Sequence, residues 1–168
     1  LSSFPHVHFM ERRFSTVIDP FDGQDATSTC GGEKTSLWQD MPAYAPTGLI
    51  AAGFDVRQPN KPEAESGALD LKSFRVDAPA LVFWVRVFGV EAGDRLHLRL
   101  LQPNGRAVVD IRGEPIDRHK EQFFQFAGKK RIGAKWPAGI YRGEFRLLRN
   151  TNAGEQAVVS ATREVQVR

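Results

Sequence analysis

Two histidines near the start of the chain, His6 and His8, are the residues whose types and spacing point most directly to chemistry. One residue separates them, so on a β-strand both imidazoles would project from the same face. A neutral imidazole is a common zinc ligand, and a catalytic zinc ion takes three protein ligands and keeps one position open. The pair could therefore supply two ligands, or one ligand and one base, but it could not complete a zinc site alone.

The residues around the two histidines predict the strand that would position them. Pro5 is unfavourable inside a helix, and Val7 and Phe9 alternate with the histidines as the buried side of a strand would. Residues 16–21 then end the unit with a turn at Asp19-Pro20. A pair with this spacing and no such context would more often be two half-exposed surface histidines.

The same residues carry a family resemblance. Ser3-Phe4-Pro5-His6-Val7-His8-Phe9, followed by Arg12 or Arg13 and then by Val17-Ile18-Asp19-Pro20-Phe21, resembles the last sequence motif of the lysostaphin-like, or LytM-type, zinc endopeptidases. These enzymes cut peptidoglycan cross-bridges. In that family the motif reads roughly Pro-His-Leu-His-Phe-Glu-Val-Arg, followed by a short hairpin and Val-Asp-Pro.

The resemblance implies roles for both histidines: His8 would be a zinc ligand, and His6 would act in catalysis beside the metal. The family's other ligands, a histidine and an aspartate separated by three residues, lie upstream of this motif and are expected outside this chain. Met10 stands where a glutamate is usual. The resemblance therefore implies that residues 1–22 are the C-terminal segment of a zinc metalloendopeptidase domain, inactive without the upstream part.

The resemblance also implies partners and a location. The partners would be peptidoglycan and the upstream part of the peptidase domain, which could be a separate chain. The location would be periplasmic, or otherwise extracytoplasmic, in bacteria.

Residues 23–45 are rich in Gly, Ser, Thr and Asp and predict a connector, in which Leu37-Trp38 would anchor onto a neighbouring surface. Cys30 is the single cysteine, so an intrachain disulfide is impossible. No base or metal ligand adjoins it in the sequence, and an intermolecular disulfide stays open.

Residues 46–168 predict an immunoglobulin-like antiparallel β-sandwich. Short segments of alternating or continuous apolar residues follow one another, and turn residues such as Pro103-Asn-Gly105 separate them. Phe83 and Trp84 are expected in the core, and a short turn of helix is expected near 118–121. The expected strands are 49–56, 68–74, 80–90, 95–102, 107–112, 122–127, 139–149 and 157–167.

The charge pattern limits the classes of partner that are expected. The formal net charge is +3, and the local cluster Lys129-Lys130-Arg131 with Lys135 suggests a solvated hairpin tip or, alternatively, contact with an anionic polymer. Nucleic acid is not expected, because a dedicated binder has a stronger basic bias and a stacking platform or groove-reading helix. No membrane span is expected, because the longest apolar run, near 78–90, contains Arg86 and is too short.

The remaining candidate site residues are expected to be structural. His97 and His119 lack partners at metal-ligand spacing, and Glu114 and Asp117 are expected to be loop carboxylates. Two other functions stay open beside the peptidase: a noncatalytic β-sandwich binding or regulatory module, and a degenerate peptidase homologue that activates other cell-wall hydrolases.

Overall fold

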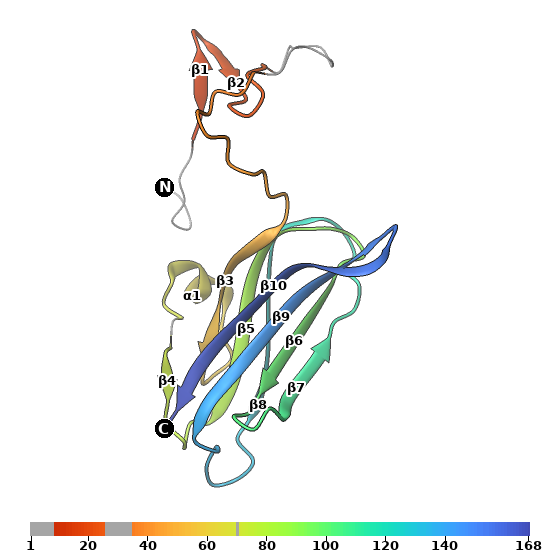
Figure 1. The fold of residues 1–168 in the computed structure, drawn as a ribbon. Coiled ribbons are helices and arrows are strands. Elements are labelled where there is room, and N and C mark those ends of the chain that lie inside the picture. The colour runs from red at the N-terminus through yellow and green to blue at the C-terminus, as the bar shows by residue number, and fades with distance from the viewer. Residues whose placement is uncertain (1–8, 26–34, 70) are drawn as a thin grey trace. The chain divides into compact units, whose positions relative to one another are not determined.

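The computed structural model describes residues 9–25, 35–69 and 71–168. The chain divides into two compact units, Leu1–Ala45 and Pro46–Arg168. In the first unit, strands β1 (Glu11–Arg13) and β2 (Thr16–Ile18) pair antiparallel as a small hairpin (Figure 1).

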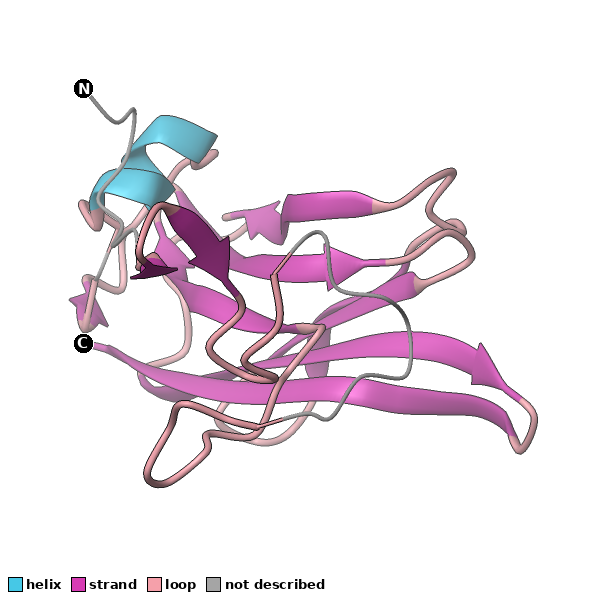
Figure 2. Ribbon diagram, turned by 90° about the horizontal axis from the view of Figure 1, so that it is seen from above, coloured by secondary structure: helices cyan, strands magenta, loops and turns pink. Residues whose placement is uncertain are grey.

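The second unit contains two β-sheets, with strand orders β3-β5-β8 and β4-β10-β9-β6-β7. Neighbouring strands are antiparallel except for the pair β4 and β10, which is parallel. The two sheets lie face to face as two layers (Figure 2). The strands are β3 (Gly48–Asp55), β4 (Ser73–Phe74), β5 (Ala80–Val90), β6 (Arg95–Leu101), β7 (Ala107–Arg112), β8 (Lys120–Lys130), β9 (Gly139–Thr151) and β10 (Gly154–Val167).

The main core lies between the two sheets because strand alternation sends every second side chain inward. Its fully buried side chains include Phe83 of β5, Leu98 of β6 and Tyr141 of β9. Gly143 of β9 faces Phe83, and a Cβ at this position would overlap the Phe83 ring. The absence of a side chain at 143 thus allows the large ring to enter the core.

Helix α1 (Lys61–Ser66) covers part of the outer face of the three-stranded sheet (Figure 1). Asn60 caps its start by accepting a hydrogen bond from the Glu63 N–H at 2.9 Å, and Gly67 ends it with φ = +77°. Ala64 of α1 and Leu69, which follows the helix, pack with the Trp84 indole in a second, smaller cluster.

The all-β, antiparallel sandwich predicted from the sequence is confirmed, and β5 and β7 have the predicted bounds. Three local expectations were wrong. Residues 68–74 contribute only the short strand β4, residues 118–121 are not helical because β8 begins at Lys120, and Trp84 lies in the outer cluster rather than between the sheets. Immunoglobulin-like connectivity stays a prediction.

No helix within the described residues is long and apolar enough to cross a membrane.

Candidate functional site

The hairpin that follows the two histidines is the part of the predicted zinc-site motif that the structure describes. Glu11 pairs with Ile18 and Arg13 with Thr16, and Phe14 lies in the turn with φ = +56° and 97% exposed. His6 and His8 lie outside the described residues. Their shared strand, and the roles of His8 as a zinc ligand and His6 in catalysis, therefore stay predictions.

Asp19 organises the loop after β2. Its Oδ1 accepts a hydrogen bond from the Phe21 N–H at 2.8 Å, and its carbonyl accepts one from the Gly23 N–H at 2.7 Å. Its own N–H donates to the Gln24 carbonyl at 2.8 Å. A carboxylate that bonds the backbone two residues ahead forms an Asx-turn, so the Asp-Pro element is a turn, as its sequence predicts.

Aromatic rings gather beside this loop. The Trp38 ring centroid lies 5.7 Å from that of Phe9 and 6.0 Å from that of Phe21, and the Leu37 N–H donates to the Pro20 carbonyl at 2.9 Å. The connector thus returns to the hairpin at Leu37-Trp38, as expected. Phe9 was expected on a buried side but is 64% exposed. Among the described residues up to 45, only Ile18 is buried, so the hairpin has no core of its own there.

The described residues contain no group of three or more His, Cys, Asp or Glu side chains that could hold a metal ion. His119 is exposed in the loop before β8. The Lys120 ammonium lies 2.7 Å from an Asp117 carboxylate oxygen and lowers the pKa of that carboxyl. A Glu114 oxygen lies 3.9 Å from Arg95. These positions are ion-paired or exposed loop residues.

His97 belongs to a row of charges on the outer face of the five-stranded sheet. Its Nε2 lies 2.6 Å from Asp110 Oδ1, and the Arg99 guanidinium bridges Asp110 at 3.1 Å and Glu144 at 2.8 Å. The hydrogen bond to His97 is the first cause of the lowered pKa of Asp110, and the one to Arg99 adds to it. The sequence indicated that His97 faces outward but not this partner, which depends on the register between β6 and β7.

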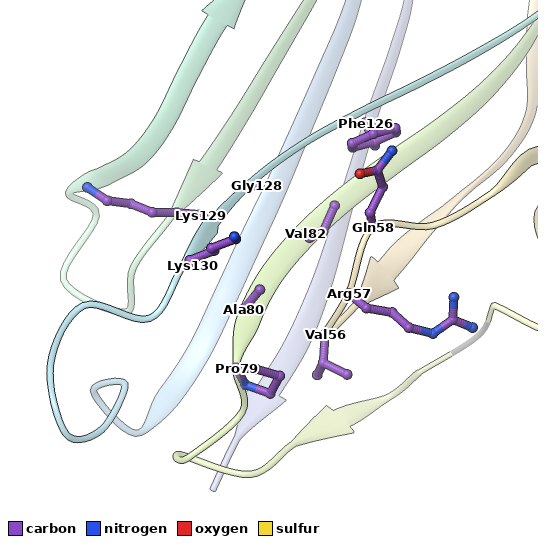
Figure 3. Close-up of a pocket in the computed structure, with 10 residues that line it drawn as sticks. All are labelled: Val56, Arg57, Gln58, Pro79, Ala80, Val82, Phe126, Gly128, Lys129 and Lys130. Carbon is purple, nitrogen blue, oxygen red and sulfur yellow. The ribbon is translucent and has the colours of Figure 1, made fainter.

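A groove of 390 Å³ opens on the outer face of the three-stranded sheet (Figure 3). Its floor is mainly apolar, with Ala80 and Val82 on β5 and Phe126 and Gly128 on β8. Gly128 is opposite Val82, and a Cβ there would lie 2.7 Å from Val82 Cγ2. A larger residue would therefore crowd this floor. Such a concave apolar surface is a common form of binding site.

Polar groups border the groove. Lys130 extends from β8 toward β5, whereas Lys129 extends to the other side of its strand (Figure 3). On the other rim, the Arg57 guanidinium is held by the Glu63 carboxylate through hydrogen bonds of 2.7 and 2.9 Å, which raises the Arg57 pKa and lowers that of Glu63. The lysines were visible in the sequence, but the groove was not, because it depends on which strands lie side by side.

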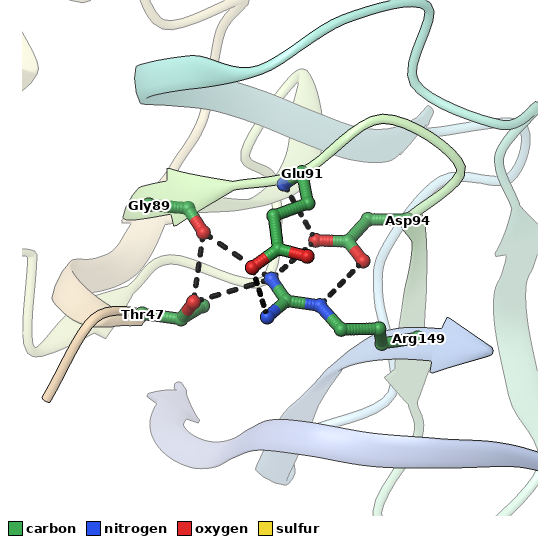
Figure 4. A network of polar contacts seen from close by, with 5 residues as sticks. All are labelled: Thr47, Gly89, Glu91, Asp94 and Arg149. Carbon is green, nitrogen blue, oxygen red and sulfur yellow. Dashed lines mark hydrogen bonds and ion pairs between the residues drawn. The ribbon is translucent and has the colours of Figure 1, made fainter. Parts of the chain in front are cut away.

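A second polar cluster, around Arg149, is structural (Figure 4). The Arg149 guanidinium donates to both carboxylate oxygens of the buried Asp94 at 2.8 Å, and it also bonds Glu91, Thr47 and the Gly89 carbonyl. The hydrogen bond from Arg149 to Asp94 is the main reason that the Arg149 pKa is raised. The Arg149 guanidinium and the Asp94 carboxylate are both bonded inside the cluster, so the cluster fixes the start of β3 and the turn after β5.

No family model matches this chain, and no curated protein matches it.

Proposed function

We propose that residues 1–22 are the C-terminal segment of a zinc-dependent peptidoglycan endopeptidase domain in a bacterial periplasmic or extracytoplasmic protein. The observation that carries the proposal is the order of elements. The His6-Val7-His8 segment precedes a short hairpin, β1 and β2, and a turn at Asp19-Pro20, which is the order in the LytM-type motif.

The exposed apolar side chains of the hairpin support the proposal. Phe9 is 64% exposed, Met10 60% and Val17 46%. Contiguous exposed apolar residues commonly mark a surface that packs against another element. The upstream part of the peptidase domain would supply that element, as well as a histidine and an aspartate that complete the zinc site with His8.

The two imidazoles would have different tasks. Zinc, when bound, supplies a Lewis acid. His8 would hold the metal as a neutral imidazole, while His6 would accept and return a proton near the reacting atoms. The donor set proposed for zinc consists of His8 and upstream residues, as the family resemblance implies.

The test uses the intact protein that contains this chain, purified with zinc, and measures both the zinc content and the release of soluble fragments from peptidoglycan. His8→Ala is expected to lose both. His6→Ala is expected to keep the zinc but lose at least about a hundredfold in rate, the usual contribution of a general acid or base. His97→Ala is the matched control and should change neither.

Two results would oppose the proposal. One is a His8→Ala protein with the zinc content and activity of the unmodified protein. The other is an intact protein without a histidine and an aspartate upstream at the family's spacing, which would favour the noncatalytic or the activator function.

A further inference from the structure

The groove on the three-stranded sheet and the basic loop after β8 form one surface. A second hollow, of 260 Å³, lies on the other side of the end of β8, and Lys129 and Lys130 line both hollows. We call this the β8-end surface. It consists of the groove floor, made by Ala80, Val82, Phe126 and Gly128, and the cations Arg106, Lys129, Lys130 and Lys135.

The four cations of the β8-end surface are exposed, and within the described part of the chain no ion pair involves them. Among the described residues that line the two hollows, none is an aspartate or a glutamate. A cluster of like charges without counter-charges has a positive potential that attracts an anionic partner.

Arg131 lies next to these cations in the sequence, but its guanidinium holds the loop after β8 in place and is not free to bind a partner. Its guanidinium donates to the carbonyls of Ala78, Gly133 and Ala134 at 3.2, 2.6 and 2.7 Å. The Trp136 indole N–H donates to the same Ala78 carbonyl at 2.9 Å. These bonds hold the loop against the start of β5, so Lys130 and Lys135 are presented from an ordered segment.

The groove floor selects among anionic partners. A sugar would leave hydroxyl donors facing a floor of apolar side chains. Of the described residues that line the groove, Gln58 has the only neutral polar side chain and none has a carboxylate. An extended peptide with acidic residues at every second position around an apolar residue matches both features, because residues two positions apart project to the same face. Its apolar side chain would fill the groove while its carboxylates meet the lysines.

We propose that the β8-end surface binds an extended acidic segment of a partner polypeptide. An apolar side chain of the segment occupies the groove over Val82 and Phe126. Carboxylates on the same face of the segment pair with Lys130 at the rim and, on the other side of β8, with Lys129 and Lys135. This binding does not depend on the zinc site.

The experiment measures the fluorescence anisotropy of a fluorescein-labelled peptide with the sequence Glu-Ser-Leu-Ser-Glu-Ser-Glu, titrated with the protein. Saturable binding is expected. Replacing the leucine by glycine should weaken it about tenfold or more, because the groove then gains no apolar contact. The same peptide with lysine in place of each glutamate should not bind.

Variants of the protein separate the two parts of the surface. The double change Lys129→Ala with Lys130→Ala should weaken binding about tenfold or more, and Ala80→Gln should weaken it by placing a polar side chain over the floor. The matched control is Arg146→Ala with Arg163→Ala, which removes two exposed charges elsewhere and should change the affinity less than about twofold. Circular dichroism melting curves establish that each variant is folded.

Polygalacturonate, a carboxylated glycan, serves as the competing probe. If it binds as tightly as the glutamate-leucine peptide and Ala80→Gln leaves both affinities unchanged, the surface recognises charge alone and the proposal is wrong. Absence of peptide binding to the folded protein overturns it as well.

Discussion

On the outer face of the five-stranded sheet, charged side chains pair with one another across neighbouring strands. The outer face of the three-stranded sheet is mainly apolar, with the largely buried Arg86 among its apolar side chains, and is partly covered by α1. Arg99 lies between Asp110 and Glu144, and Arg142 pairs with Glu164 at 3.2 Å. On the other sheet, Trp84 is only 3% exposed.

This difference indicates where a ligand can gain affinity. On the five-stranded sheet, an approaching anion would have to displace carboxylates that already hold the arginines. On the three-stranded sheet, the cover provided by α1 ends before the strands do, and the open groove has cations without counter-charges at its rim. The charges on the five-stranded sheet are already paired with one another, whereas the groove on the three-stranded sheet offers a ligand both apolar area and unpaired positive charge.

The comparison is tested most strongly by Trp84→Ala. If α1, β3 and β5 enclose a true second core, this change should lower the free energy of unfolding by about 3–5 kcal/mol, the usual cost of emptying a buried aromatic site. Urea unfolding followed by circular dichroism measures it. Arg146→Ala, on the exposed face of the other sheet, should change the same quantity by less than about 0.5 kcal/mol.

Trp84→Phe is expected to lower the free energy of unfolding less than Trp84→Ala does. Among the described residues the buried Trp84 indole N–H has no hydrogen-bond partner, so phenylalanine keeps much of the apolar contact and removes a donor that these residues leave unsatisfied. If Trp84→Ala costs less than about 1 kcal/mol, the outer cluster is not a core.

Two arginines allow a direct comparison of the faces. The Arg86 side chain is 8% exposed, lies 3.6 Å from Glu65 and donates to Gln122 at 3.0 Å, whereas the Arg99 side chain is 35% exposed. Arg86→Ala should cost about 1–3 kcal/mol because Gln122 and the Ala64 carbonyl lose a buried donor. Glu65 keeps Lys61 as an ion-pair partner at 3.5 Å. Arg99→Ala should cost less than about 1 kcal/mol because water replaces its contacts.

Salt separates these two effects. Urea denaturation at low and at high sodium chloride measures the difference in the free energy of unfolding between Arg99→Ala and the unmodified protein. This difference should shrink at high salt, because exposed charges are screened. The cost of Arg86→Ala should persist. Equal costs for the two changes would remove the distinction between the faces.

The cover itself is tested by Asn60→Ala, which removes the cap of α1. A loss of about 1 kcal/mol is expected in the free energy of thermal unfolding, because the Glu63 N–H loses its acceptor. Asn60→Ser keeps a capping oxygen and should lose much less. An unchanged melting temperature for Asn60→Ala would mean that α1 contributes little to the cover.

The sequence predicted the sandwich because its strands are signalled locally. The alternation in β6 and the apolar run of β5 between turn residues place those strands almost to the residue. Helix α1 was missed because six residues are too few to show a helical period, although Asn60 and Gly67 are typical cap residues at its two ends.

The surfaces could not be predicted in the same way. The groove combines Val82, Phe126 and Gln58, which approach one another only through strand pairing and the path of the chain after β3. The pairing of His97 with Asp110 likewise depends on register. For the predicted zinc-site motif, the structure describes the hairpin and the Asp19 turn, and the roles of His6 and His8 continue to rest on the sequence.

The smallest expected effect is the pH dependence of the stability that Asp110 contributes on the outer face of the five-stranded sheet. The pKa of Asp110 is lowered, chiefly by its hydrogen bond to His97, so its ionised form is favoured in the folded state. A group with a lowered folded pKa stabilises the protein at pH values above its unfolded pKa, about 4, and this contribution is lost as the pH falls through the folded value. Asp110→Asn should therefore lower the free energy of unfolding by less than about 1 kcal/mol near neutral pH, since Asp110 is half exposed.

Urea denaturation of both proteins between pH 7 and pH 2 measures this difference, which should close as the pH falls below about 4. Asp40→Asn, at an exposed position in the first unit, is the control and should leave the midpoint of the sandwich unchanged at every pH. A difference between Asp110→Asn and the unmodified protein that stays constant down to pH 2 would mean that the contact depends on shape rather than on charge. In that case the outer face of the five-stranded sheet would not be stabilised by the ion pairs that distinguish it from the other sheet.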